Sequence, residues 1–285
     1  MRPRSAHIEP SSRFSFWALV IFLLVLWGAG GASRADAAGQ VVARSSAWII
    51  LFCFVLTASS IGWRQVRVPL ILTGAMVLLA VVQLVPLPPA WWMALPGRDV
   101  LEGAALVVRE EQPWRPLSIS PSATSNALGS LIVPVVLILL AANLNVRQHR
   151  QLVTLLLALT VAGALLGLLQ FSGARFNHPL VNDINGMVSA NFANRNHFAL
   201  LLSIGCVVAL TWAFEGEDIR QKIVIAPGIV LLFCLLILAT GSRTGVLLGI
   251  IGVALGLAIV GRRALREFSH LSRKVLITLF LLVMG

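Results

Sequence analysis

The chain has 285 residues, of which 58% are hydrophobic and only 12% charged, with a net charge of +11 and a mean hydropathy of +0.90. A soluble domain carries about 25% charged residues, so this composition excludes a soluble globular domain and a disordered chain. The apolar segments are continuous rather than alternating, which excludes a transmembrane barrel and predicts an all-α, polytopic transmembrane helical bundle. The basic residues lie in short clusters between apolar runs, which indicates membrane topology rather than nucleic-acid binding.

A helix needs about 20 apolar residues to cross a bilayer, and eight runs of the sequence approach or reach this length. These runs are 14–32, 46–62, 69–85, 126–143, 152–171, 197–214, 223–240 and 245–260. A ninth apolar run begins at Val275 and has eleven residues when the sequence stops, about half of a span. We therefore expect one membrane domain, residues 1–285, that belongs to a longer protein.

The orientation of the spans is predicted from the distribution of Lys and Arg, which are enriched in cytoplasmic loops. With a cytoplasmic N-terminus, 14 of the 22 basic residues fall on the inner side, including the cluster from Arg262 to Lys274. The first run follows a basic start and precedes Ala35-Asp36-Ala37, as in a signal peptide. Because this run is longer than the usual apolar region of about 7–15 residues, we interpret it as an uncleaved first span.

Two predicted outer loops, about residues 86–125 and 172–195, are longer than the others. The first begins with a Pro-rich segment that disfavours helix and carries tryptophans of the kind that anchor at the headgroup level. The second loop is rich in Asn. Its His178 and Asp183 either form an acid–base pair or are separate loop residues that face water. Both loops have the hydrogen-bonding capacity to face a polar ligand or simply water.

Glycine and proline also mark individual runs. The eighth run contains glycines at a spacing that lets helix backbones pack closely, which predicts a helix–helix contact. They are Gly245, Gly249, Gly252 and Gly256. Pro134 and Pro227 lie inside the fourth and seventh runs, where kinks are tolerated if neighbouring groups satisfy the freed carbonyl.

The first candidate site is Asn191-Phe-Ala-Asn194-Arg195-Asn196-His197-Phe198, at the outer end of the sixth run. Arg195 lies where the loop enters the helix, and helix N-termini have free N–H groups and a partial positive charge. An Arg at that position adds five planar donors, a combination that suits phosphate or diphosphate. The alternative is an interfacial Arg whose head extends to water.

The second candidate site is Thr240-Gly241-Ser242-Arg243-Thr244-Gly245, a short turn before the eighth run, with Ser242 as a plausible N-cap. The same alternative of an interfacial Arg applies here. Since the sixth and eighth runs both start on the outer face, Arg195 and Arg243 share one depth. We hypothesise that both bind one diphosphate, supported by Asn194, Asn196 and Ser242, provided that the two helices touch.

These two segments carry a family resemblance. Residues 191–199 resemble the GTF-x-N-x-N-x-FA stretch of the O-antigen ligase/polymerase superfamily of bacterial membrane proteins, and residues 240–245 are similar to its TGSRGA-type stretch. Residues 86–89, followed by residues 114–118, are similar to related exopolysaccharide members, so the resemblance covers about residues 69–260. Ser189-Ala190-Asn191 and Thr244 differ from the family pattern, which commonly has Gly-Thr and Gly there.

The resemblance implies a metal-independent glycosyltransferase without a cofactor, on the periplasmic face of the bacterial inner membrane. The donor would be a glycan on undecaprenyl diphosphate, with Arg195 and Arg243 holding the diphosphate. The acceptor would be lipid A-core, a growing polysaccharide or a protein. The catalytic base would be a His in an outer loop beyond Gly285. Fixed cations would stabilise the charge that develops on the departing diphosphate.

Three alternatives remain open. An exopolysaccharide or capsule polymerase and a protein O-oligosaccharyltransferase would use the same donor chemistry. A membrane transporter or a non-catalytic export scaffold belongs to another class. A transporter predicts inverted repeats with broken helices near mid-membrane, and the sequence shows no such repeat.

Overall fold

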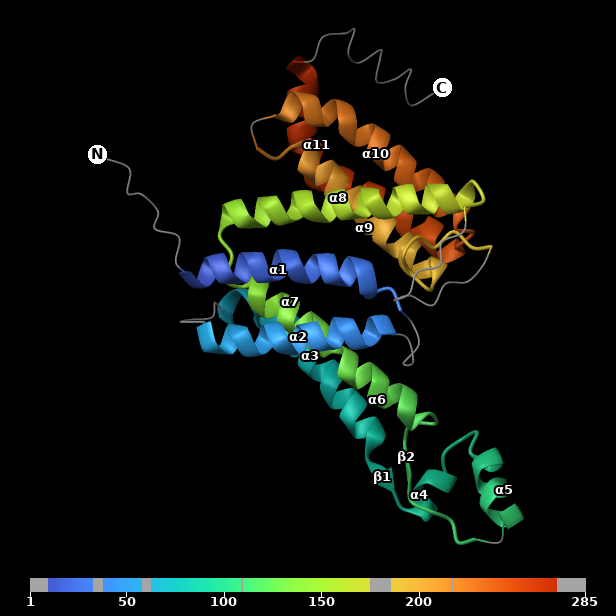
Figure 1. Ribbon diagram of the computed structural model, residues 1–285. Helices are drawn as coiled ribbons and strands as arrows, with labels where there is room; N and C mark the ends of the chain where they lie inside the picture. The colour runs from blue at the N-terminus through green and yellow to red at the C-terminus, as the bar shows by residue number, and fades with distance from the viewer. Residues whose placement is uncertain are drawn as a thin grey trace. The chain divides into compact units, whose positions relative to one another are not determined.

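The computed structural model describes residues 10–32, 38–57, 63–108, 110–174, 186–216 and 218–270 (Figure 1). These residues form helices joined by short connections, with one small antiparallel ribbon. The helices are α1 Pro10–Ala29, α2 Ala38–Thr57, α3 Trp63–Leu84, α4 Pro89–Met93, α5 Asp99–Val108, α6 Pro121–Ser130, α7 Ile132–Ala141, α8 Val146–Phe171, α9 Arg195–Ala213, α10 Ile219–Ala239 and α11 Arg243–His270. The ribbon pairs β1 Pro86–Leu87 with β2 Arg115–Pro116.

Eight helical segments of the described chain are long and apolar enough to cross a membrane, which confirms the predicted polytopic all-α class. Seven are single helices, and α6 and α7 together form the fourth span, Pro121–Ala141. The ninth predicted run, from Val275, lies outside the described residues. The chain divides into two compact units, Met1–Ser15 with Arg44–Asn143 and Phe16–Ala43 with Leu144–Gly285.

In the first unit, α3 packs against α6 and α7, and the fourth span is interrupted at Leu131. Pro134 explains the interruption, because proline lacks the N–H that would bond to the carbonyl of Ser130. Arg44 binds at this break, where its Nη2 donates to Ser130 Oγ at 2.6 Å and to the carbonyl oxygen of Asn126 at 2.8 Å. Arg44 lies near the start of α2, before the apolar run predicted at 46–62.

The loop predicted at residues 86–125 is partly helical and has its own small core, so the expectation that its prolines block helix is wrong. Pro89 is the first residue of α4, where a missing N–H costs nothing. Trp92 is 0% exposed, and its Nε1 donates to the carbonyl oxygen of Pro113 at 2.9 Å. The guanidinium of Arg115 lies 5.3 Å from the centre of the Trp92 ring. Trp92 is therefore a packing residue, in contrast to the predicted headgroup anchor.

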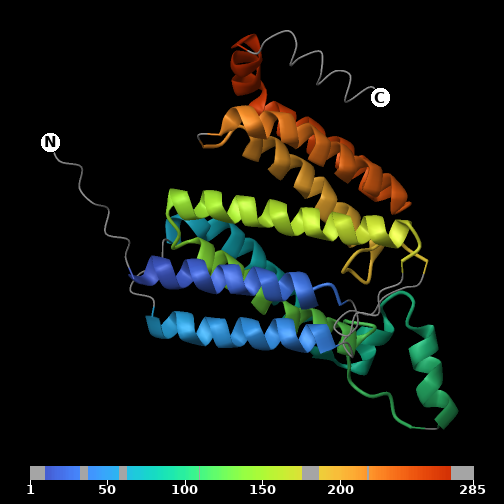
Figure 2. The same cartoon turned by 45° about the horizontal axis from the view of Figure 1, so that its top comes forward.

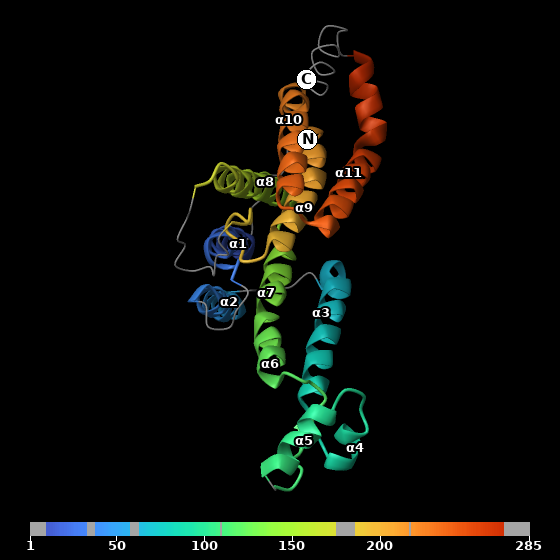
Figure 3. The same cartoon turned by 90° about the vertical axis from the view of Figure 1, so that its right-hand side faces the viewer.

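In the second unit, α9 is the central helix, and α8, α10 and α11 all pack against it. Figure 3 shows α9 and α10 side by side, with α11 diverging from α10 toward its C-terminal end. The core is formed by large apolar side chains from α8, α9 and α10. They include Leu157, Phe198, Leu202, Phe233, Leu236 and Ile237. The part of α1 in this unit lies along α8 (Figure 2), and Trp27 Nε1 donates to the carbonyl oxygen of Leu159 at 2.9 Å.

Three of the four predicted glycines of α11 face α9, which confirms the predicted helix–helix contact. The exception is Gly249, where a Cβ would lie 3.0 Å from Cδ1 of Ile237 on α10. A Cβ at Gly245 would lie 2.5 Å from the Cβ of Ala199, and one at Gly252 would lie 2.5 Å from the carbonyl oxygen of Ser203. Further along, a Cβ at Gly256 would meet Leu210 at 2.6 Å. Residues of α9 and α11 thus pair in ascending order, so the two helices run parallel and begin at the same end.

Candidate functional site

Arg195 is the first residue of α9, and a side-chain cap fixes the start of that helix. The Oδ1 of Asn194 accepts a hydrogen bond from the backbone N–H of Asn196 at 2.8 Å. Asn194 therefore acts as the N-cap, while Asn196 is exposed and contributes its backbone to the cap. Arg195 itself is half-buried at this helix end, where the free N–H groups add positive potential.

Arg243 is the first residue of α11 and follows a tight turn. Ser242 is buried, and its Oγ accepts from the backbone N–H of Gly245 at 2.9 Å, which confirms Ser242 as the N-cap. The turn needs Gly241, whose φ of +62° is unfavourable for residues with a side chain. Thr240 Oγ1 accepts from the N–H of Ser242 at 3.2 Å, and Arg243 is exposed beyond this rigid turn.

The structure brings the two arginine-bearing segments together. A Cβ placed on Gly241 would lie 3.4 Å from Nη1 of Arg195, so this guanidinium rests against the turn that precedes Arg243. Within the described part of the chain, neither Arg195 nor Arg243 forms an ion pair or a hydrogen bond. Two cations without a protein anion thus lie at two adjacent helix starts, an arrangement that can bind a multiply charged anion.

The loop before α9, residues 186–194, is held by groups that sequence reasoning missed. Gln170 at the end of α8 donates from Nε2 to the carbonyl oxygen of Ala190 at 3.0 Å. Its Oε1 accepts from the N–H groups of Ser189 at 3.0 Å and Ala190 at 2.7 Å. One side chain therefore satisfies three backbone groups of the loop. The polar Gln170 at the end of an apolar run was the one signal in the sequence.

A second set of contacts ties this loop to the segment after α1. The Nδ2 of Asn191 donates to the carbonyl oxygen of Trp27, and the N–H of Ala193 donates to the carbonyl oxygen of Gly31 at 2.9 Å. A Cβ at Gly31 would lie only 1.9 Å from the carbonyl oxygen of Asn191, so this approach requires glycine. The position of Arg195 is thus fixed from α1 and α8 as well as from its own helix.

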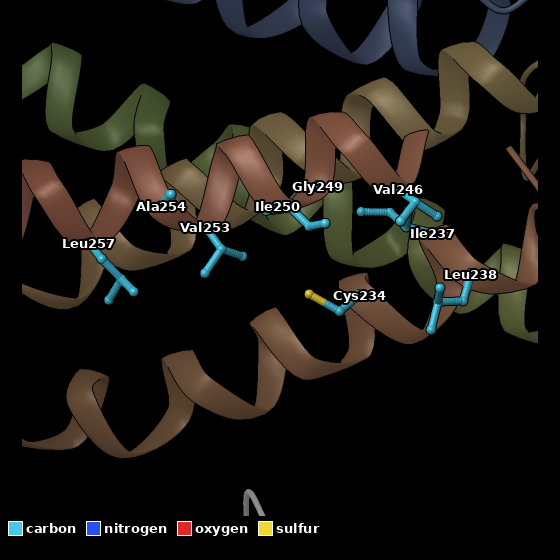
Figure 4. A pocket seen from close by; sticks show the side chains of 9 residues that line it. All are labelled: Cys234, Ile237, Leu238, Val246, Gly249, Ile250, Val253, Ala254 and Leu257. Carbon is cyan, nitrogen blue, oxygen red and sulfur yellow. The ribbon is translucent and has the colours of Figure 1, made fainter. Parts of the chain in front are cut away.

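An apolar groove lies between α10 and α11 (Figure 4). It has a volume of about 440 Å³ and begins near Leu238 and Val246, close to the start of α11. Cys234, Val253 and Leu257 also line a second cavity, of about 540 Å³, which continues toward the opposite end of the helices. The groove exists because α10 and α11 both pack on α9 and diverge from each other, a feature that hydropathy does not reveal.

The remaining sequence candidates lie elsewhere. His178 and Asp183 lie outside the described residues, within the part of the predicted outer loop from 175 to 185. Within the described segments, no three His, Cys, Asp or Glu side chains come together as metal ligands would.

Comparison with known proteins adds no relative. No family model, curated protein or solved structure matches this chain.

Proposed function

We propose that the protein is a membrane glycosyltransferase that transfers a glycan from an undecaprenyl-diphosphate carrier to an acceptor on the periplasmic face of the bacterial inner membrane. The observation that carries the proposal is that the guanidinium of Arg195 lies against the turn that precedes Arg243, near one end of an apolar groove. The proposal covers O-antigen ligases, exopolysaccharide or capsule polymerases and protein O-oligosaccharyltransferases. These enzymes share the donor chemistry and differ in the acceptor.

The charges and the groove fit the two parts of such a donor. A diphosphate carries at least two negative charges, and Arg presents planar pairs of donors that match phosphate oxygens. A polyprenyl chain is apolar and needs a surface without polar groups. The lining of the groove, from Val246 to Leu257 on α11 and from Cys234 to Leu238 on α10, is of this kind.

The arginines would act on the leaving group. An acceptor hydroxyl attacks the anomeric carbon of the donor sugar and forms the new glycosidic bond. The bond between that carbon and the diphosphate oxygen breaks, its electron pair stays on the diphosphate, and the hydroxyl proton passes to a general base. Because negative charge grows on the diphosphate in this step, Arg195 and Arg243 would lower the barrier.

Glycan transfer by arginine variants tests the proposal. Transfer is measured in membranes from cells that express the full-length protein. Arg195→Ala and Arg243→Ala should each reduce transfer roughly ten- to a hundredfold, because each variant loses a hydrogen bond to a charged group. Arg→Lys at either position should restore transfer only in part, since Lys keeps the charge and loses the planar fork. An interfacial anchor would accept Lys freely.

A matched control is Arg220→Ala, which removes an exposed cation from the first turn of α10, outside the arginine pair. This variant should transfer glycan at the wild-type rate per molecule of protein in the membrane. Wild-type transfer by both Arg195→Ala and Arg243→Ala would disprove the donor site.

A further inference from the structure

A second basic site lies in the same unit as α9, at the opposite end of that helix from Arg195. A pocket of about 170 Å³ opens where the N-terminal ends of α8 and α10 meet the C-terminal end of α9. Most of its lining residues are polar or charged, and three of them are basic. The lining residues are Arg147, Arg150, Gln151, Thr154, Trp212, Glu215, Gly216 and Lys222.

Lys222 is held at the wall of this pocket rather than extended into solvent. Its Nζ donates to the carbonyl oxygen of Glu215 at 2.7 Å and lies 5.2 Å from the centre of the Trp212 ring. An ammonium has three N–H donors, so the bond to Glu215 leaves donors for another acceptor. The aromatic face and the carbonyl thus keep a positive charge in place at the pocket.

The charge of the pocket is unbalanced. Arg147, Arg150 and Lys222 contribute three positive charges, and Glu215 contributes the one carboxylate in the lining. Within the described segments, none of the three cations forms an ion pair with a carboxylate. Arg147 and Arg150 lie in the first two turns of α8, where the helix end adds positive potential. The pocket therefore favours an anion.

We propose that this pocket binds the phosphate group of an anionic phospholipid. Three spans end around it, which places it at headgroup depth, and Trp212 is of the residue type that concentrates there. Beyond the pocket, the surface of α8 is apolar, with Leu156 exposed, so acyl chains can continue along the helix. Basic pockets between transmembrane helices are suited to such headgroups. The predicted topology places this end on the cytoplasmic side, so the lipid would come from the inner leaflet.

The thermal stability of the purified full-length protein in a neutral detergent tests this site. Phosphatidylglycerol should raise the unfolding temperature, and phosphatidylcholine at the same concentration should not. Arg147→Gln combined with Arg150→Gln should weaken phosphatidylglycerol binding roughly ten- to a hundredfold for each lost charged hydrogen bond. Glu215→Gln should strengthen binding, which keeps the test informative if the double variant folds poorly. The matched control, Arg220→Gln, removes a nearby cation outside the pocket and should bind as wild type.

Four outcomes would overturn the proposal. Equal stabilisation by phosphatidylcholine would show that the charge of the headgroup has no role. Equal stabilisation by inorganic phosphate at the same phosphate concentration would assign the pocket to a soluble anion. Loss of binding in Arg220→Gln as large as that in the pocket variant, or unchanged binding in Glu215→Gln, would show that the lipid does not bind in this pocket.

Discussion

At the scale of single residues, Gln170 determines how firmly the loop before α9 is held. Its side chain bonds three backbone groups of Ser189 and Ala190. In Gln170→Leu these groups lose their partner, and an unsatisfied buried polar group costs about 1–3 kcal/mol. We therefore expect the free energy of unfolding in detergent to fall by at least about 1 kcal/mol, as measured by thermal or denaturant unfolding. Gln151→Leu, an exposed position on the same helix, is the control, and an equal loss in both variants would contradict this role.

The sequence predicted the residues that project from the two helix starts and missed those that hold them. Ser242 was expected as an N-cap because a hydroxyl before a helix is a local signal, and the structure confirms it. Gln170, Trp27 and Gly31 act on a loop that is 20 to more than 160 residues away in the sequence. Such partners depend on the tertiary fold and have no local pattern.

At the scale of helices, the contact between α9 and α11 depends on glycines without room for a side chain. In Gly252→Ala, the new Cβ would lie 2.5 Å from the carbonyl oxygen of Ser203, so the helices must separate. Overpacking of this kind costs about 1–3 kcal/mol, and the unfolding temperature should fall accordingly. Gly228→Ala is the matched control, because a Cβ there on α10 meets nothing within 4 Å. A similar stability for the two variants would mean that α9 and α11 are not in close contact.

Hydropathy located every span of the described chain, but several helices begin earlier than the apolar runs. The span predicted at 46–62 begins at Ala38, because Arg44 is accommodated inside α2 by hydrogen bonds to Asn126 and Ser130. Helices α4 and α5 were not predicted, because a helix this short is stabilised by packing rather than by periodicity. For α4, the packing residue is Trp92, which is buried and bonds to the carbonyl oxygen of Pro113.

At the scale of the whole molecule, the topology remains a prediction. Cysteines introduced at Ser122 and Ser269, in a variant without the natural cysteines, report which side of the membrane each position faces. A membrane-impermeant maleimide should label Ser122→Cys in intact cells and label Ser269→Cys only after permeabilisation, because positive charge disfavours export of the Arg262–Lys274 segment. Labelling of Ser269→Cys but not Ser122→Cys in intact cells would reverse the topology and place both arginines in the cytoplasm.

Arg195 and Arg243 are proposed to act together because α9 and α11 begin side by side. The predicted topology puts both arginines at one membrane depth, and the parallel packing of α9 and α11 brings their two helix starts together. The apolar groove forms because α10 and α11 both pack against α9, so no single apolar run of the sequence predicts it. Under the proposed function, the diphosphate of the donor would bind at the arginines and its polyprenyl chain would lie in the groove.

A double-mutant cycle on donor binding tests this claim most directly. Binding of undecaprenyl diphosphate is measured for the full-length protein in nanodiscs of neutral lipid, with Arg195→Ala, Arg243→Ala and the double variant. Each single variant should bind roughly ten- to a hundredfold more weakly. Because both side chains would hold one diphosphate, the double variant should lose less than the product of the two single losses. Wild-type affinity in both single variants, or fully independent losses in the double variant, would contradict a shared diphosphate site.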